Sequence, residues 1–463
     1  MTTIRSSFLA CCLAASAVLA QVPLPAEVPA AAPVVASTRR AVPLEEALKL
    51  TAVNNQDFAA ARAQQVQIQA QASRVWSAIL PEISVSGSLV RTSAPSKLDL
   101  GDFVNLVGGV YGLPQQNPSL IPPPVAIVNE NSAYGTLLIS QILFTPQLLL
   151  IPAATDGVEA ARLGSLEARE QVLLATAKVY LGLEGLGQLE SAAREAELVA
   201  LKREKDIRAQ IAVGMAVEVA SLRAQSETAQ ARNTLAQLAG SREQLLGLLE
   251  ALTGEAVRPL EGAGKPDFGT AAAEEAAPWN DNYLLKAQAV GLEALEAFRT
   301  YDRLAWMPTL VAQAKGNYNS NSGFTGKQFS YDLILGLNIP LYDRGVRYAN
   351  MHENDAKAVE QRAKLQSSRQ KAKANWVATR ASLQASEAAL VLAESQAALA
   401  SRAQKQLESA VSAGVSTALE LSDIDNKRFL AASAAAQARS QVEIRRVELA
   451  AAEGRLAKAI GLD

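Results

Sequence analysis

Two stretches, Ala78-Ile-Leu-Pro81 and Leu304-Ala-Trp-Met-Pro308, lead from a helical pattern into alternating apolar and polar residues. The alternation covers residues 82–91 after the first proline and 309–318 after the second. Proline ends a helix because it has no backbone N–H to donate. Alternation with a period of two is typical of a strand with two different faces. Pro81 and Pro308 therefore mark helix-to-strand junctions, and their repetition predicts a duplicated fold.

Each repeat continues with a second alternating stretch and a long helical run that stops at a glycine. The stretches end at Phe144 and Tyr342, and the glycines are Gly214 and Gly414. The separation is 70 positions in the first repeat and 72 in the second. A helix of seventy residues would be about 105 Å long, so we expect a coiled-coil-like bundle or tube rather than a compact core. The matched lengths indicate that both repeats reach the same depth.

The predicted fold is mainly α with a β-barrel part. Each repeat contributes a helix, a β-hairpin and a long helical hairpin. The first repeat, 44–252, is predicted to hold a helix over 44–80, strands over 82–92 and 133–145, and long helices over 153–213 and 216–252. The second, 279–461, is predicted to hold a helix over 279–307, strands over 309–319 and 329–342, and long helices over 345–413 and 416–461. Residues 21–43 and 253–278 are predicted linkers, the first extended and the second irregular.

The N-terminus has the pattern of a secretory signal peptide over residues 1–20. Arg5 supplies a positive charge, an apolar run follows, and Val18-Leu-Ala20 resembles a cleavage site. The run is too short to span a membrane. Both cysteines, Cys11 and Cys12, lie within it, so the mature chain would have none, and lipidation at either stays open. Export without a spanning helix leaves a periplasmic, secreted or outer-membrane protein.

Composition and motifs give no sign of an enzyme, a cofactor, a metal site or a nucleic-acid partner. The net charge is −2, and the chain has one histidine. His352-Glu-Asn-Asp355 lacks the second histidine of a zinc-protease helix, and Gly262-Ala-Gly-Lys265 lacks the upstream glycine of a phosphate-binding loop.

The predicted strands have the length that a tilted transmembrane β-strand needs. A solvated sheet in a soluble domain would alternate equally well, so the strands alone leave both alternatives open.

Several motifs along the chain resemble those of one known family. Val42-Pro-Leu-Glu-Glu-Ala-Leu48 and Asn54-Asn-Gln-Asp-Phe58 are similar to its start. Ser140-Gln-Ile-Leu-Phe144 and Gly336-Leu-Asn-Ile-Pro-Leu-Tyr-Asp-Arg-Gly345 resemble its strand exits, and Ala413-Gly-Val-Ser-Thr-Ala-Leu-Glu-Leu421 resembles its periplasmic tip. The motifs occur in the family's order and cover essentially all of the predicted mature chain. The family they resemble is that of the TolC-type outer-membrane efflux factors, the outer channels of tripartite efflux and type I secretion systems.

The resemblance implies a homotrimer with a twelve-stranded outer-membrane barrel and an α-helical periplasmic tunnel. Four strands cannot close alone, and an open edge in lipid would leave backbone groups unpaired. Phe144 and Tyr342 are then candidates for aromatic residues at the membrane interface, with plain packing at the junction as the alternative. The implied partners are outer-membrane lipid, a periplasmic adaptor (membrane fusion) protein and an inner-membrane transporter.

The resemblance also implies a periplasmic gate near the second tip glycine. Glu420 and Asp423 lie six and nine positions after Gly414, where the family has acidic residues around the aperture. Three copies would bring six carboxylates together and favour cations. The alternative is that both acids interact with the dipole of the helix N-terminus. Ala220 stands where the family often has an acid, so a lock between the two tips is in doubt.

The turns themselves are the implied contact with the adaptor. These residues are Gly214, Gly414, Val213, Val415 and Ser416. Residues 93–132 form a long loop expected at the cell surface.

Together, these features predict an outer-membrane channel subunit for passive export of small molecules, with a periplasmic extension, in a Gram-negative bacterium. A type I protein-secretion duct and a periplasmic coiled-coil protein without a pore stay open as alternatives.

Overall fold

The computed structural model describes residues 39–77, 79–98, 100–112, 125–214, 217–260, 262–268, 274–321 and 327–462. The predicted signal peptide over 1–20, with Cys11 and Cys12, lies outside these residues. By its internal contacts the chain divides into two units. Unit 1 comprises 1–65, 164–283 and 370–463, and unit 2 comprises 66–163 and 284–369. Each unit therefore takes segments from both sequence repeats.

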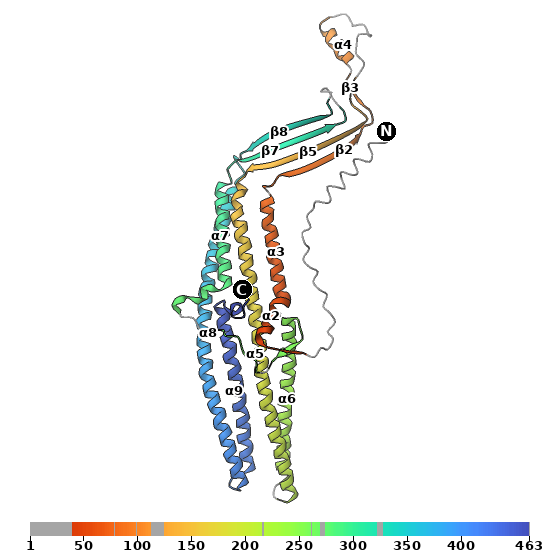
Figure 1. The fold of residues 1–463 in the computed structure, drawn as a ribbon. Coiled ribbons are helices and arrows are strands. Elements are labelled where there is room, and N and C mark those ends of the chain that lie inside the picture. Colours follow the sequence, from red (N-terminus) through yellow and green to blue (C-terminus); the bar gives the residue numbers. More distant parts are fainter. Residues whose placement is uncertain are drawn as a thin grey trace. The chain divides into compact units, whose positions relative to one another are not determined.

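Unit 2 contains a four-stranded antiparallel sheet in the order β2-β5-β7-β8 (Figure 1). The strands are β2 (Glu82–Arg91), β5 (Asn131–Phe144), β7 (Thr309–Asn319) and β8 (Phe329–Asn338). The hairpin of each repeat contributes two neighbouring strands, and β5 joins β7 across the repeats. Within the described residues, the outer edges of β2 and β8 have no strand beside them.

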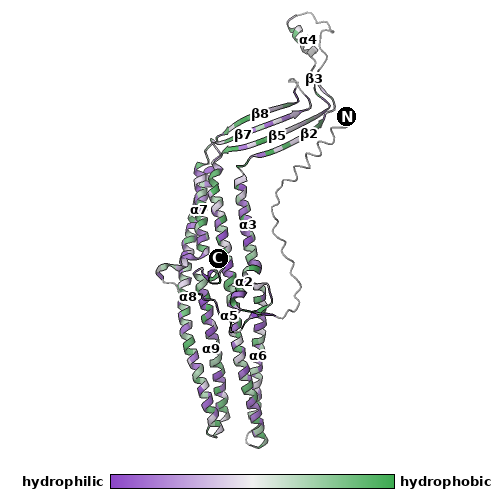
Figure 2. Ribbon diagram, viewed as in Figure 1, coloured by the Kyte–Doolittle hydropathy of each residue, from purple (hydrophilic) through white to green (hydrophobic). Residues whose placement is uncertain are grey.

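The register gives the sheet one apolar face and one polar face. Opposite residues in an antiparallel ladder point to the same side, so Ile83, Ile139, Ala314 and Leu333 share a face. Seven other large side chains on this face are exposed, whereas Leu310 and Tyr318 are half-buried. The exposed ones are Val85, Leu89, Leu137, Phe329, Tyr331, Leu335 and Leu337. The opposite face carries mainly polar residues, such as Ser84, Ser86, Ser88, Lys315, Asn317, Ser330 and Asp332. The predicted alternation is therefore present in both repeats and in phase between them (Figure 2).

The helices that adjoin the sheet are long. They are α3 (Gln56–Ser77), α5 (Ile151–Ala212), α7 (Tyr283–Leu304) and α8 (Val346–Ser412). In unit 2, Asn354 donates to buried Asp302 at 2.7 Å, which ties α8 to α7. In contrast, α3 has no buried residue. No helix in the described ranges combines the length and apolar character required to cross a membrane.

Unit 1 has an apolar core where the remaining elements meet α5. These are α2 (Leu44–Asn54), α6 (Glu218–Thr253), α9 (Ala418–Ala452), α10 (Leu456–Ala459), β1 (Arg40–Val42) and β6 (Val257–Pro259). Core residues include Leu44, Leu48, Leu173, Tyr180, Leu249, Val447 and Leu456. The Tyr180 hydroxyl donates to the Val42 carbonyl at 2.9 Å. Burial raises the pKa of Tyr180 to about 12, so the hydroxyl stays protonated and keeps this bond at physiological pH.

Both predicted linkers contain residues that belong to this core. Arg40–Val42 pairs in parallel with Val257–Pro259, and Val42 and Val257 are completely buried. The linker prediction was wrong for these segments because each three-residue strand is stabilised by its distant partner rather than by a local pattern.

The prediction of a single helix over 44–80 was also wrong, because the helix is interrupted at Asn55. The backbone of Asn55 is extended, and its side-chain oxygen accepts the N–H groups of Asp57 and Phe58 at 2.9 and 3.1 Å. The side-chain nitrogen of Asn55 donates to the Leu252 carbonyl at 3.1 Å. These bonds replace helix continuation with a cap for the next helix.

Three further boundaries differ from prediction. Strand β8 ends at Asn338 rather than at residue 342, because Pro340 has no N–H for the ladder. The helix predicted over 279–307 begins as a 3-10 turn at Pro278–Asp281, and α7 starts after Asn282, which has ψ of 131°. The helix predicted over 416–461 divides at Gly454, which has φ of +64°.

The long loop predicted over 93–132 is partly regular. It contains β3 (Ser96–Leu98), α4 (Leu100–Val110) and β4 (Val125–Val128), and β3 pairs with β4 in an antiparallel ladder. Strand β5 begins at Asn131, two residues before the predicted start.

Helix α5 approaches α9 closely at Gly185. A Cβ at this position would lie 2.7 Å from both Cβ and Oγ of Ser440. Ser440 Oγ donates to the Leu181 carbonyl at 3.1 Å, so the serine is held in place. The absence of a side chain at Gly185 thus sets the distance between the two helices.

We expect Gly185→Ala to lower the free energy of unfolding by about 1–3 kcal/mol, because the new methyl group overlaps Ser440. Gly187→Ala is the matched control on the same helix, since a Cβ there meets nothing within 4 Å. It should be neutral or stabilising by up to about 1 kcal/mol through helix propensity. Denaturant unfolding of the detergent-solubilised protein measures both. Equal effects of the two substitutions would show that this crossing is not tightly packed.

Candidate functional site

The candidate site lies in unit 1, where each long helix reverses direction. Gly214 separates α5 from α6, and Gly414 separates α8 from α9. Their φ values are +77° and +76°, in the left-handed region where glycine has no steric penalty. The neighbouring valines Val213 and Val415 are 69% and 82% exposed. The turns therefore present apolar side chains to their surroundings.

The second turn is fixed by a capping box at the start of α9. Thr417 Oγ1 accepts the Glu420 N–H at 3.3 Å, and Glu420 Oε2 accepts the Thr417 N–H at 3.1 Å. The Ser416 hydroxyl also donates to Glu420. These donors, the Ser416 hydroxyl first, lower the pKa of Glu420 below its ordinary value. The carboxylate therefore keeps its contribution to stability above the ordinary range of glutamate and loses it only as pH falls through the lowered pKa.

Asp423, the other predicted gate residue, lies one turn further along α9. It forms an ion pair with Lys427 at 2.6 Å, and both side chains are more than 60% exposed. Glu420 is likewise exposed. Both acids thus lie on the accessible surface of α9, and Glu420 also supports the helix N-terminus, as the alternative interpretation expects. The gate role itself stays a prediction.

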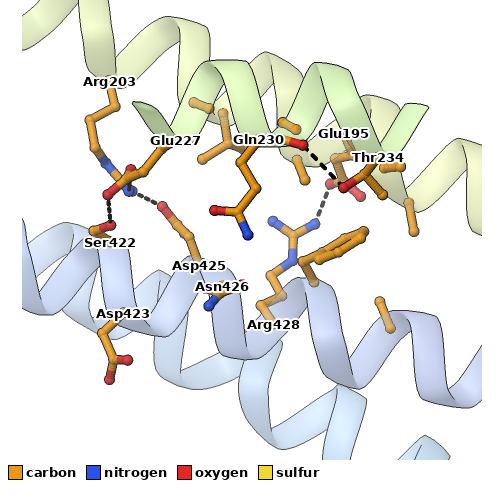
Figure 3. A pocket seen from close by; sticks show the side chains of 18 of the residues that line it. Glu195, Arg203, Glu227, Gln230, Thr234, Ser422, Asp423, Asp425, Asn426 and Arg428 are labelled. Atoms are coloured by element: carbon orange, nitrogen blue, oxygen red, sulfur yellow. Dashed lines mark hydrogen bonds and ion pairs between the residues drawn. The ribbon is translucent and has the colours of Figure 1, made fainter. Parts of the chain in front are cut away.

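A cluster of polar side chains, which the sequence analysis did not identify, lies further from the turns. Arg203 of α5 forms ion pairs with Glu227 of α6, at 3.4 Å, and with Asp425 of α9. The Ser422 hydroxyl of α9 donates to Glu227 at 2.5 Å. Figure 3 shows Arg203, Glu227 and Asp425 converging from three helices, whereas the carboxylate of Asp423 points away from them.

A second set of contacts extends the cluster to α8. Gln404 of α8 donates to Asp425 at 2.9 Å and accepts from Arg428 of α9 at 3.2 Å. Arg428 also pairs with Glu195 of α5. The cluster, hereafter the hairpin link, therefore connects the helical hairpin of repeat 1 (α5 and α6) with that of repeat 2 (α8 and α9). An open cavity of about 690 Å³ adjoins it. Apart from the link, its lining includes six alanines and Val199, and also the predicted gate residues Glu420 and Asp423.

The centre of the hairpin link is shielded from water. The side chains of Arg203 and Asp425 are 10% and 13% exposed. Burial lowers the pKa of Arg203 despite the opposing effect of Glu227, although arginine stays charged at any physiological pH. A buried cation between two carboxylates needs both partners, because an unpaired charge there would be strongly unfavourable. The hairpin link thus fixes the lateral position of one hairpin against the other.

The sequence contains a signal for the hairpin link, because several of its residues lie at matching distances from the turn glycines. Arg203 lies 11 residues before Gly214, Asp425 lies 11 after Gly414, and Gln404 lies 10 before Gly414. Positions equally far from the turn in antiparallel helices lie at the same height, here about 16 Å from the turn. Polar residues that match in this way identify candidates for contacts between hairpins.

The predicted junction residues lie at the ends of the strands in unit 2. Pro81 and Pro308 immediately precede β2 and β7, and Phe144 ends β5. Tyr342 lies beyond β8 and is 82% exposed. The place of Phe144 and Tyr342 at a membrane interface stays a prediction.

Comparison with solved structures defines the class of fold. A crystal structure of a membrane protein from Pseudomonas aeruginosa superimposes with a TM-score of 0.74 at 18% identity and covers 89% of this chain and 93% of the other. The outer membrane protein VceC from Vibrio cholerae gives 0.70 at 16% identity, covering 89% and 96%. The MtrE outer membrane channel of Neisseria gonorrhoeae gives 0.71 at 17% identity, covering 91% and 94%. The chain therefore has the fold of outer-membrane channel proteins.

The family model of the outer membrane efflux protein matches residues 280–455, so the second half of the chain carries a domain of this family. The resemblance to TolC-type efflux factors is thereby confirmed. No sequence match was found among curated proteins.

We expect Arg203→Ala to lower the free energy of unfolding by about 3–5 kcal/mol, because Glu227 and Asp425 would face each other without a cation. The control is the adjacent Lys202→Ala. Its 3.5 Å ion pair with Glu408 is largely exposed, so its loss should cost at most about 1 kcal/mol. Thermal and denaturant unfolding measure both variants. A loss for Arg203→Ala no larger than for the control would contradict a buried link.

Proposed function

We propose that this chain is the outer-membrane channel subunit of a tripartite efflux pump and gives passive export of small molecules. The observation that carries this function is the sheet β2-β5-β7-β8. Ten of its large apolar side chains are exposed on one face: Ile83, Val85, Leu89, Leu137, Ile139, Phe329, Tyr331, Leu333, Leu335 and Leu337. Such a continuous apolar face requires a lipid or protein environment. The opposite polar face suits a water-filled lumen.

The two free edges of the sheet argue for assembly of several copies. Lipid cannot satisfy the backbone groups along β2 and β8, so each edge needs another strand. Because the sheet has four antiparallel strands, an even number, β8 of one copy runs antiparallel to β2 of the next. Three copies would close a ring of twelve strands, which is wide enough for a solvent-filled pore.

The helical part extends the duct towards the periplasm. The exposed turns at Gly214 and Gly414 would contact a periplasmic adaptor through Val213, Val415 and Ser416. Energy would come from an inner-membrane transporter, because a channel of this kind is a passive conduit rather than an enzyme. Glu420 and Asp423 would line the narrow end.

The alternative of a periplasmic coiled-coil protein without a pore does not account for the sheet. A coiled coil needs apolar residues on helices and has no use for ten exposed apolar side chains on strands. The membrane channel gives every one of them an apolar environment.

The purified chain in planar lipid bilayers should produce discrete single-channel currents and should need detergent to stay in solution. The polar face of the sheet provides the conducting surface. Extraction from membranes by carbonate alone, together with the absence of conductance, would contradict the channel and favour the structural protein.

The acidic gate is tested by the charge-neutralising double variant Glu420→Gln with Asp423→Asn. Both substitutions keep hydrogen-bond acceptors at the start of α9, so the turn should stay folded. We expect weaker preference for cations over anions in bilayer recordings, because the carboxylates at the narrow end are removed. The control is Glu394→Gln, which neutralises an exposed acid of α8 that lies 20 residues before Gly414, away from the proposed ring. Unchanged ion selectivity in the double variant would contradict the assignment of Glu420 and Asp423 to the gate.

A further inference from the structure

Helix α4, in the loop between β2 and β5, has several exposed apolar side chains among its described residues. Leu106, Val110 and Tyr111 are 67%, 74% and 75% exposed, and Val107 is 38% exposed. At 100° per residue, these four positions share an arc of about 140° of the helix surface. Exposed apolar side chains gathered on one side of a helix indicate a surface that another molecule covers.

The sequence around α4 offers no basic side chain for an anionic partner. From Phe103 to Asn129, 27 consecutive residues carry no charge. The nearest basic residue in the loop is Lys97. Phosphate groups of a lipid surface would be bound by lysine or arginine, and a loop that faces only water would carry charged residues.

The connection to the sheet holds α4 away from the lipid-facing strands. Strand β2 uses 10 residues, about the number that a tilted strand needs to cross a membrane. The β3-β4 ladder then separates α4 from the end of the sheet. The base of this ladder is fixed: Asn321 donates to buried Ser132 at 2.6 Å and accepts the Asn129 N–H at 3.0 Å. The helix thus lies beyond the strands on an anchored stalk.

The stalk rises from an edge of the sheet that needs a second copy. Strand β2 is an edge strand, and its free side is the one that β8 of a neighbouring chain would occupy in the proposed channel. The hairpin that carries α4 is therefore next to the subunit boundary. A neighbouring copy supplies the same helix, whose charge-free part from Phe103 to Val110 matches the exposed apolar residues of α4 itself.

We propose that α4 packs through Leu106, Val110 and Tyr111 against α4 of neighbouring copies and forms a cap over the outer mouth of the channel. This inference rests on the proposed function, since only an assembled channel brings the loops together. The cap would have to open, or be displaced, for large solutes to leave.

Single cysteines on α4 test the contact. Both native cysteines lie in the predicted signal peptide, so an introduced thiol would be the only one in the processed chain. Val110→Cys should form a disulfide between copies on mild oxidation of intact cells, seen as a dimer band on a non-reducing gel. Gly109→Cys is the matched control, because its Cβ would meet nothing within 4 Å and points away from the centre of the apolar face. It should stay monomeric on the gel. Leu106→Cys replaces Val110→Cys should the latter fail to fold.

Two further measurements separate this inference from the function on which it rests. Amine cross-linking of the wild-type protein should give trimers, and their absence would overturn the channel and the cap together. Trimers without a Val110→Cys disulfide would overturn the cap alone. In bilayers, oxidation of Val110→Cys should lower conductance, and a reductant should restore it. A fluorophore on Val110→Cys that is quenched by brominated acyl chains would place α4 in lipid and contradict the contact.

Discussion

The proposed channel depends on the pairing of the sheet edges. β5 and β7 have neighbours on both sides, whereas β2 and β8 have a neighbour on one side only. Because one face of the sheet is apolar and suits lipid, the free backbone donors and acceptors along each edge would have to be satisfied without water. The demand for strand partners and the demand for an apolar environment have one common solution, a closed ring of copies in a membrane. The duplication of the chain serves this solution, because each repeat supplies one hairpin with its apolar residues in phase.

The helical part combines exposed turns with a buried cluster of charges. The turns at Gly214 and Gly414 are exposed and apolar, while about 16 Å away the hairpin link buries Arg203 between two carboxylates. The link gives the two hairpins a fixed relation within one chain, because its charges are stable only when both hairpins contribute. Residues nearer the turns, such as Glu420 and Asp423, stay accessible to ions, a partner or neighbouring copies. The same helices thus have a fixed contact at the hairpin link and accessible side chains closer to the turns.

Local patterns predicted the parts of the fold that depend on local chemistry. The strands begin at Glu82 and Thr309 because Pro81 and Pro308 end the helices before them. Alternation predicted the two faces of β8, and the structure places one apolar residue, Ile334, on the polar face. The break at Asn55 could not be predicted in this way, since it depends on a bond to Leu252 almost two hundred residues away. The pairing of Arg40–Val42 with Val257–Pro259 was missed for the same reason. The hairpin link also involves long-range contacts, but Arg203 and Asp425 could have been identified as candidates because they lie equally far from Gly214 and Gly414.

Disulfide scanning between β2 and β8 tests the closed ring most directly. Within one chain these strands are three strand spacings apart, about 14 Å, which is too far for a disulfide. Ser86→Cys on the polar face of β2 is combined in turn with Ser330→Cys, Asp332→Cys and Ile334→Cys on the same face of β8. The account predicts that one combination gives a covalent trimer on a non-reducing gel, and that reduction returns it to monomer. Monomers at every register, from protein that is folded and inserted in the membrane, would contradict the pairing of β2 with β8 between copies.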